Sequence, residues 1–127
     1  MKKSSGFSAT FLIAAPVSIC SNDQFDGVFH LAAQSHPHGV RPPFYTQQVN
    51  AVGTLNLLEG LPRDTRFMFC STSEVYGAPD LKEGERISED WPITTVNPYA
   101  SSKAASDIFV QERIRNGFVD GVITRAF

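Results

Sequence analysis

Apolar residues along the chain gather in three short runs that have the length of β-strands. The runs cover residues 27–33, 66–72 and 121–127, and they are rich in phenylalanine and β-branched residues. Short apolar runs without strict alternation are typical of strands that are buried on both faces of a sheet. The pattern therefore predicts three strands, the first two of them buried on both faces.

Two further segments have the spacing and the end signals of helices. Residues 44–60 place valine and leucine at helical intervals, and Gly60 marks the end of this pattern. Asn97 followed by Pro98 is a favoured N-cap with proline at the first helical position, which predicts a second helix over residues 98–116. Each predicted helix thus lies between two predicted strands.

The elements follow one another as strand, helix, strand, loop, helix and strand. This alternation requires right-handed crossovers and predicts an α/β fold, a partial Rossmann-like parallel sheet with helices on its faces. Residues 77–96 contain proline, glycine and several acidic residues without a sustained period, so we expect them to form a loop. A loop of that length in a small domain is usually functional or disordered.

Composition restricts the possible classes of function. The chain is 42% hydrophobic and 19% charged with a net charge of −2, which gives no reason to expect nucleic acid or a membrane as partner. Cys20 and Cys70 lack metal-ligand spacing and fit a reducing, cytoplasmic compartment. His36-Pro-His38 has no third ligand nearby, so no metal is expected, and His30 is interpreted as a hydrogen-bonded core histidine.

Tyr99 and Lys103 stand four residues apart at the start of the second predicted helix. On a helix this spacing places both side chains on one face, one turn apart. A phenol with its usual pKa of about 10 is a poor base at neutral pH, and a neighbouring ammonium lowers that pKa by favouring the phenolate. The pair alone fits equally a half-buried tyrosine beside a solvated lysine, which is the commoner arrangement.

Polar and small residues follow the first two predicted strands. Residues 32–35 come after the first strand, and residues 71–74 come after the second. In open parallel sheets, ligands bind at the carboxyl ends of the strands. These two positions and the start of the second helix are therefore expected to form one site.

Several motifs lie in the order that one enzyme family shows. They are His30-Leu-Ala-Ala-Gln-Ser-His36, Asn50-Ala-Val-Gly-Thr-Leu-Asn-Leu-Leu-Glu59, Ser71-Thr-Ser-Glu-Val-Tyr-Gly77, Asn97-Pro-Tyr-Ala-Ser-Ser-Lys-Ala-Ala-Ser-Asp107 and Thr124-Arg-Ala-Phe127. Together they resemble the extended short-chain dehydrogenases, the NAD-dependent epimerase/dehydratase family. The resemblance covers residues 24–127, interpreted as a partial NAD(P)-binding Rossmann domain, and leaves residues 1–23 unassigned.

Within that family, Thr72-Ser73-Glu74 resembles the Thr-x-Glu of nucleotide-sugar 4,6-dehydratases, most closely the GDP-mannose type. Simple 4-epimerases usually have no carboxylate at this place. The resemblance implies that Tyr99 takes the proton of the sugar 4-hydroxyl and that Thr72 hydrogen-bonds the same oxygen. Glu74 would take the C5 proton, and Lys103 would hold the nicotinamide ribose and lower the pKa of Tyr99. The alternative interpretation of Glu74 is a surface carboxylate on a turn that has no role in catalysis.

The same resemblance implies NAD or NADP as cofactor and a nucleotide sugar as substrate. The implied cofactor contacts are Leu31, Ala32, Ala33, Gln34, Ser35, Tyr45, Tyr99 and Lys103. Ser35 and Ser73 would contact the substrate together with Thr72 and Glu74. Helical spacing alone interprets Tyr45 equally well as a packing residue.

The chain lacks the glycine-rich loop and the C-terminal substrate domain of the family. We therefore expect the isolated chain to be an inactive fragment of a homo-oligomeric enzyme. The alternatives within the family are a nucleotide-sugar 4-epimerase, a 4-keto-6-deoxy-sugar reductase and a UDP-glucuronate decarboxylase. Outside enzymes, the alternative is a non-catalytic dinucleotide-binding protein.

Overall fold

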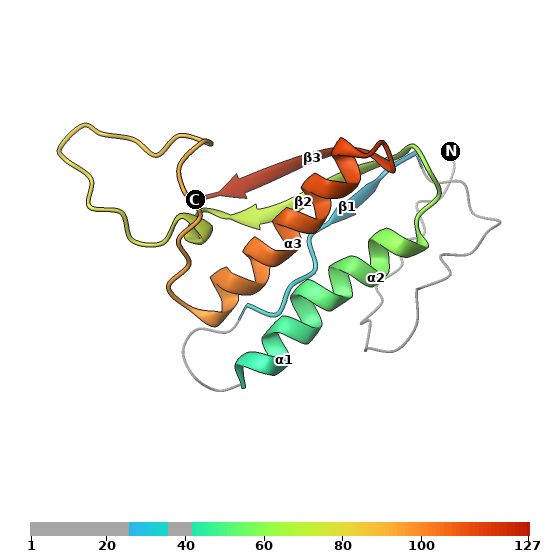
Figure 1. Cartoon of the computed structure of the whole chain (residues 1–127), viewed down its shortest axis with the longest axis horizontal. Helices are drawn as coiled ribbons and strands as arrows, with labels where there is room; N and C mark the ends of the chain where they lie inside the picture. Colours follow the sequence, from blue (N-terminus) through green and yellow to red (C-terminus); the bar gives the residue numbers. More distant parts are fainter. Residues whose placement is uncertain (1–25, 36–41) are drawn as a thin grey trace, which may run out of the picture.

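A computed structural model describes residues 26–35 and 42–127, which form a three-stranded parallel sheet with helices packed against it (Figure 1). Strands β1 (Val28–His30), β2 (Thr65–Thr72) and β3 (Val119–Ala126) lie in this order across the sheet. The predicted α/β fold with a parallel sheet is confirmed. The unassigned residues 1–23 and the two histidines at 36 and 38 lie outside the described residues.

One helical segment connects β1 to β2, and a single helix leads into β3. The first consists of α1 (Pro43–Gln47), the π-helical turn η1 (Gln48–Val52) and α2 (Gly53–Gly60). The second is α3 (Pro98–Arg115), whose N-cap is Asn97, as predicted. Both predicted helices are confirmed to within one residue at each end, whereas the π turn was not predicted. None of the helices in the described ranges is long and apolar enough to cross a membrane.

The helices cover one face of the sheet, as the view in Figure 1 shows. Phe67 and Phe69 of β2 point to this face and form the core together with Leu57, Leu58, Val110 and Val119. Side chains alternate along a strand, so Phe29 and Val122, which flank Met68 in register, point to the other face. Phe29 is 74% exposed and Val122 55%. The prediction that the first strand is buried on both faces is therefore wrong, because the described helices leave this second face uncovered.

A short 3₁₀ turn, η2 (Ser73–Tyr76), follows β2 and opens the predicted loop, which is confirmed as irregular structure up to Asn97. The two ends of the loop are tied together at Thr94. Its backbone N–H donates to the carbonyl of Val75 at 2.9 Å, and its hydroxyl donates to the carbonyl of Tyr76 at 2.8 Å. Gly77 permits this contact, because its φ is +72° and a Cβ there would lie 1.9 Å from the Thr94 carbonyl oxygen.

This geometry predicts a large stability difference between two glycine substitutions. Gly77→Ala adds a clash with backbone to the strain of a positive φ, so we expect it to lower the free energy of unfolding by about 3 kcal/mol or more. Gly84→Ala is the matched control: its φ is +83°, but nothing lies within 4 Å of the added Cβ. It should cost only about 1 kcal/mol. Equal urea midpoints for the two variants would contradict the Gly77–Thr94 contact.

His30 lies between the sheet and α2 as a hydrogen-bonded histidine, which confirms the interpretation from sequence. Its Nε2 lies 2.9 Å from the hydroxyl of Thr54, and its ring packs against those of Phe67 and Phe69. Burial, and secondly the positive charge of Lys103, lower the pKa of His30 from 6.5 to about 4. The folded protein therefore keeps this imidazole neutral in mildly acidic solution.

The lowered pKa of His30 makes stability depend on pH in a defined window. As the pH falls from 6.5 to about 4, the unfolded chain binds a proton on His30 that the folded chain does not, so stability decreases. The contribution lost approaches roughly 3 kcal/mol below that window. Urea unfolding across the window should show a shallower decrease for His30→Gln than for the wild type. Parallel curves would contradict the assignment.

Candidate active site

The end of β2 and the start of α3 meet at the carboxyl edge of the sheet. Thr72, the last residue of β2, is buried, and its hydroxyl oxygen accepts a hydrogen bond from the backbone N–H of Glu74 at 3.3 Å. This contact forms the η2 turn, in which Ser73 is half-buried and Glu74 exposed. The turn therefore places a hydroxyl and, two residues later, a carboxylate at the end of β2, where ligands bind in parallel sheets.

Asn97 joins this turn to α3. Its Oδ1 accepts a hydrogen bond from the backbone N–H of Ala100 at 2.8 Å, which caps the helix. Its Nδ2 donates to Oε2 of Glu74, also at 2.8 Å. The carboxylate of Glu74 is thereby held at the N-terminus of α3, two residues before Tyr99. The negative charge of Glu74 acts on Tyr99, so these two side chains lie near each other.

The pKa of Tyr99 is raised, which is opposite to the predicted direction. Burial raises it most, followed by the negative charge of Glu74 and then by a charge on Cys70. Both the low polarity around the half-buried ring and the nearby carboxylate of Glu74 disfavour the charged phenolate. The predicted lowering of this pKa by Lys103 is not seen in the protein without a bound cofactor, where burial and the charge of Glu74 raise the pKa of Tyr99 instead.

Lys103 is almost fully buried, with 3% of its surface exposed. Its Nζ lies 4.4 Å from the centre of the Phe69 ring, a cation–π contact on the sheet side of α3. Burial lowers the pKa of Lys103, and negative charges on Cys70 and Asp107 oppose that shift. The alternative interpretation of the pair, a half-buried tyrosine beside a solvated lysine, does not fit, because Lys103 is buried one turn from Tyr99.

The segment after β1 presents small side chains on a fixed backbone. Ala32, Ala33 and Ser35 are exposed, and Leu31 is 63% exposed, so a flat ligand can approach the backbone there. The backbone is held at Gln34, whose N–H donates to Oδ1 of Asn50 at 2.7 Å while its carbonyl accepts from Nδ2 of Asn50 at 3.1 Å. The side chain of Gln34 also accepts from the hydroxyl of Thr46 at 2.9 Å.

Asn50 is a site-organising residue that the sequence did not identify as such. It is buried in the π turn η1, and its Nδ2 also donates to the hydroxyl of Ser102 on α3 at 2.8 Å. Its carbonyl accepts hydrogen bonds from the hydroxyls of Thr54 and Ser106. Asn50 therefore links the segment after β1 to the helix of Tyr99. The sequence placed Asn50 at the start of a motif of the family, but this gave no indication of its contacts.

Three further predicted contact residues lie apart from the bonds described above. Tyr45 is half-buried in α1, Ser73 lies in the η2 turn, and Ser35 is exposed at the end of the described segment after β1. Their roles toward cofactor or substrate stay predictions, as do those of the other predicted site residues. Among residues 26–35 and 42–127, no group of three or more histidine, cysteine or acidic side chains has the geometry of a metal site.

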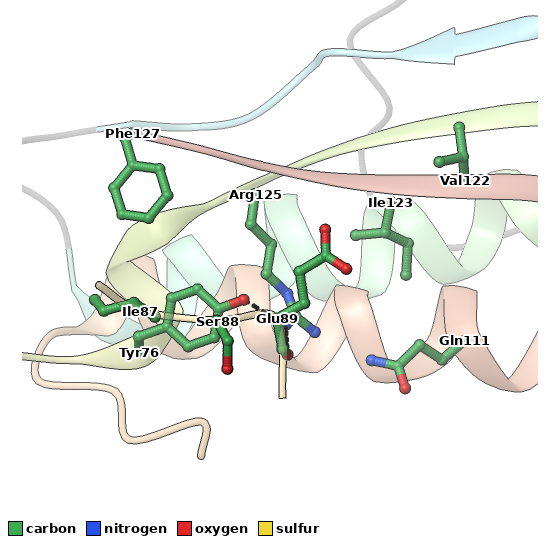
Figure 2. Close-up of a pocket in the computed structure, with 9 residues that line it drawn as sticks. All are labelled: Tyr76, Ile87, Ser88, Glu89, Gln111, Val122, Ile123, Arg125 and Phe127. Atoms are coloured by element: carbon green, nitrogen blue, oxygen red, sulfur yellow. Dashed lines mark hydrogen bonds between the residues drawn. The ribbon is translucent and has the colours of Figure 1, made fainter. Parts of the chain in front are cut away.

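A cavity of about 550 Å³ lies beside this site, between α3, β3 and the 77–97 loop (Figure 2). Its lining includes Tyr76, Glu89 and Arg125, and it contains none of the predicted site residues. Arg125 forms a bidentate ion pair with Asp107 at 2.9 and 3.1 Å, and it also donates to the Tyr76 hydroxyl and the Glu89 carbonyl. The cavity thus borders a structural clamp that connects sheet, helix and loop.

Burial pushes the pKa of Asp107 upward, but hydrogen bonds from Arg125 and Gln111 outweigh it and leave that pKa lowered. Asp107 is 0% exposed, so the charge of Arg125 is needed to keep it ionised there. The clamp therefore fixes the position of α3, and with it the positions of Tyr99 and Lys103.

The parallel sheet, the Tyr-x-x-x-Lys pair on α3 and the Thr-x-Glu after β2 define a domain of the short-chain dehydrogenase type. The model of the GDP-mannose 4,6-dehydratase family matches residues 15–127. The chain therefore belongs to this family. It is an enzyme family of nucleotide-sugar dehydratases, which confirms the resemblance seen in the sequence.

Curated relatives with similar sequences are dehydratases of two kinds. The chain is 36% identical over 101 residues to the dTDP-glucose 4,6-dehydratase of Mycolicibacterium smegmatis, a match that covers 78% of this chain and 30% of the relative. It is 41% identical over 98 residues to a GDP-mannose 4,6-dehydratase of Sordaria araneosa, which covers 71% of this chain and 17% of the relative. The chain thus spans less than a third of the length of these relatives.

Two solved structures with the same fold contain a nicotinamide cofactor. The RMD protein of Pseudomonas aeruginosa, complexed with NADPH, matches with a TM-score of 0.76 and 30% identity over 85% of this chain and 38% of that protein. The UDP-glucose 4-epimerase of Thermus thermophilus, in complex with NAD, matches with a TM-score of 0.66 and 34% identity over 79% of this chain and 33% of that protein.

Proposed function

We propose that Thr72, Glu74, Tyr99 and Lys103 are catalytic residues of a nucleotide-sugar 4,6-dehydratase that uses NAD or NADP. The observation that carries this proposal is the carboxylate of Glu74, which Asn97 holds at the N-terminus of the helix of Tyr99. Dehydration across C5 and C6 needs a base at C5 in addition to the base at the 4-hydroxyl, and an inversion at C4 does not. Two adjacent proton acceptors therefore favour dehydration.

The residues of this chain fit a bound nicotinamide dinucleotide. The exposed small side chains of Ala32 and Ala33 lie on a backbone that Asn50 fixes, which allows the close approach that a dinucleotide requires. Lys103 and Tyr99 would contact its nicotinamide ribose. When bound, the cofactor would accept a hydride from C4 of the sugar and return it to C6, and its oxidised ring would add the positive charge that Tyr99 needs as a base.

In the proposed reaction, Tyr99 takes the proton of the 4-hydroxyl as hydride leaves C4, and Thr72 hydrogen-bonds the same oxygen. The 4-ketone that forms acidifies the hydrogen on C5. Glu74 then removes this hydrogen as a proton and passes it to the departing C6 hydroxyl, so that one water leaves. Hydride adds to C6, C5 takes up a proton from solvent, Tyr99 releases the proton of the 4-hydroxyl to solvent, and the product is a 4-keto-6-deoxy sugar.

The proposed substrate is GDP-mannose, with dTDP-glucose as the second candidate. The description of the matching family and the 41% identity to the Sordaria protein support GDP-mannose. The 36% identity to the Mycolicibacterium protein supports dTDP-glucose. A cytoplasmic location and a homo-oligomeric state of the enzyme stay predictions of the sequence.

The test is an assay in D₂O of the complete protein expressed from its native reading frame. GDP-mannose and dTDP-glucose are supplied separately with NAD or NADP, and the products are analysed by mass spectrometry and NMR. We expect loss of one water and deuterium at C5, because the original C5 proton leaves in the water and C5 takes its new proton from solvent. Glu74→Gln should reduce product formation by about 100-fold or more, as expected for loss of a general base.

Inversion at C4 without loss of water would contradict the proposal and identify a 4-epimerase. Binding of NAD without any product from either sugar would favour the non-catalytic alternative. Glu59→Gln serves as the control substitution, because Glu59 is an exposed carboxylate on α2 whose nearest recorded partner is Arg113 at 4.0 Å.

A further inference from the structure

The side chain of Asn97 makes two hydrogen bonds of different chemistry at once. Its carbonyl oxygen caps α3 at Ala100, and its amide nitrogen donates to the carboxylate of Glu74, both at 2.8 Å. The cap fixes the rotamer, so the amide nitrogen has one direction in which to donate. The contact spans 23 residues of sequence and connects the two ends of the 77–97 loop.

Capping alone does not require this residue. Serine, threonine and aspartate cap helices about as well as asparagine. Of these, aspartate would bring a second negative charge to Glu74, and serine and threonine are too short to cap the helix and reach the carboxylate with a second group. An amide offers a fixed acceptor and a fixed donor on one neutral side chain. The pairing with Glu74 therefore makes use of the one chemical property that separates asparagine from the other caps.

Within the part of the chain that the structure describes, Asn97 is the only side chain that bonds the carboxylate of Glu74. Within residues 26–35 and 42–127, no lysine, arginine or histidine is recorded within 4.0 Å of its oxygens, and the Thr72 hydroxyl bonds the backbone N–H of Glu74 instead. The side chain is otherwise exposed to solvent. A flexible, exposed glutamate loses conformational freedom when it is held for reaction, and a pre-formed hydrogen bond reduces that cost.

We propose that Asn97 is a positioning residue that fixes the carboxylate of Glu74 for removal of the C5 proton, in addition to capping α3. This inference rests on the proposed dehydratase function and deepens it. Asn97 acts through Glu74 only, so it serves the elimination step. The preceding oxidation at C4 depends on Tyr99 and Lys103 and does not involve this hydrogen bond.

The division between the two steps gives a spectroscopic test in single-turnover experiments with the complete protein, its oxidised cofactor and GDP-mannose or dTDP-glucose. Reduced nicotinamide forms when C4 is oxidised and disappears when hydride returns to C6. Asn97→Ser and Asn97→Asp both keep a capping oxygen but remove the donor to Glu74. We expect both variants to form reduced nicotinamide at the wild-type rate and to consume it about 10- to 100-fold more slowly.

The thermal midpoint of Asn97→Ser should lie close to that of the wild type, because the cap is retained, and that of Asn97→Asp somewhat lower, because aspartate brings a second negative charge to Glu74; KM should not change for either variant. Asn97→Ala removes the cap and should lower the thermal midpoint, which calibrates the structural contribution. Glu74→Gln should also accumulate reduced nicotinamide, and the level it reaches sets the scale for the Asn97 variants.

Two results would overturn the inference, and they are distinguishable. If Glu74→Gln accumulates reduced nicotinamide but Asn97→Ser and Asn97→Asp consume it at the wild-type rate, Asn97 is a helix cap only and the proposed function stands. If Glu74→Gln turns over like the wild type, Glu74 is not the base, and the proposed function fails together with the role of Asn97.

Discussion

The hydrogen bond between the Asn97 amide and the Glu74 carboxylate joins the end of β2 to the start of α3, and the candidate site depends on this junction. β2 delivers the Thr72 hydroxyl, the η2 turn delivers Glu74, and α3 delivers Tyr99 and Lys103. Thr72 and Glu74 are separated from Tyr99 and Lys103 by the loop between η2 and α3. The carboxyl end of a parallel strand and the N-terminus of the following helix provide the common location, as in other parallel α/β sheets.

Buried polar contacts hold the elements at this junction in place. Asn50 ties the segment after β1 to α3 through Gln34 and Ser102, and the Asp107–Arg125 ion pair ties α3 to β3 and to the loop. A buried polar group is costly when it lacks a partner, so each of these networks specifies one arrangement of the elements more than it adds stability. The π turn at Asn50 contributes by presenting a carbonyl to the hydroxyls of Thr54 and Ser106.

The local signals in the sequence were sufficient for the elements, whereas the roles of the predicted site residues stay predictions. Asn97-Pro98 and Gly60 marked helix ends because capping and φ preferences act locally, and the apolar runs marked the strands. The exposure of Phe29 was not predictable, because burial of a strand's second face depends on what else packs there. The π turn and the link from Asn97 to Glu74 were also missed, since both arise from contacts between distant segments. The pKa of Tyr99 is raised and not lowered as predicted, because burial and the charge of Glu74 depend on the tertiary structure, which the sequence alone does not show.

The central claim is that the Glu74 carboxylate and the Tyr99 phenol share one site, and titration of the phenol tests it most directly. The ultraviolet absorbance change of Tyr99 ionisation is isolated by subtracting the curve of Tyr99→Phe, which removes the signals of Tyr45 and Tyr76. Because the negative charge of Glu74 contributes to the raised pKa of Tyr99, Glu74→Gln should lower that pKa, although burial keeps it raised. Identical titration curves for Tyr99 in the wild type and in Glu74→Gln would show that the two groups do not form one site.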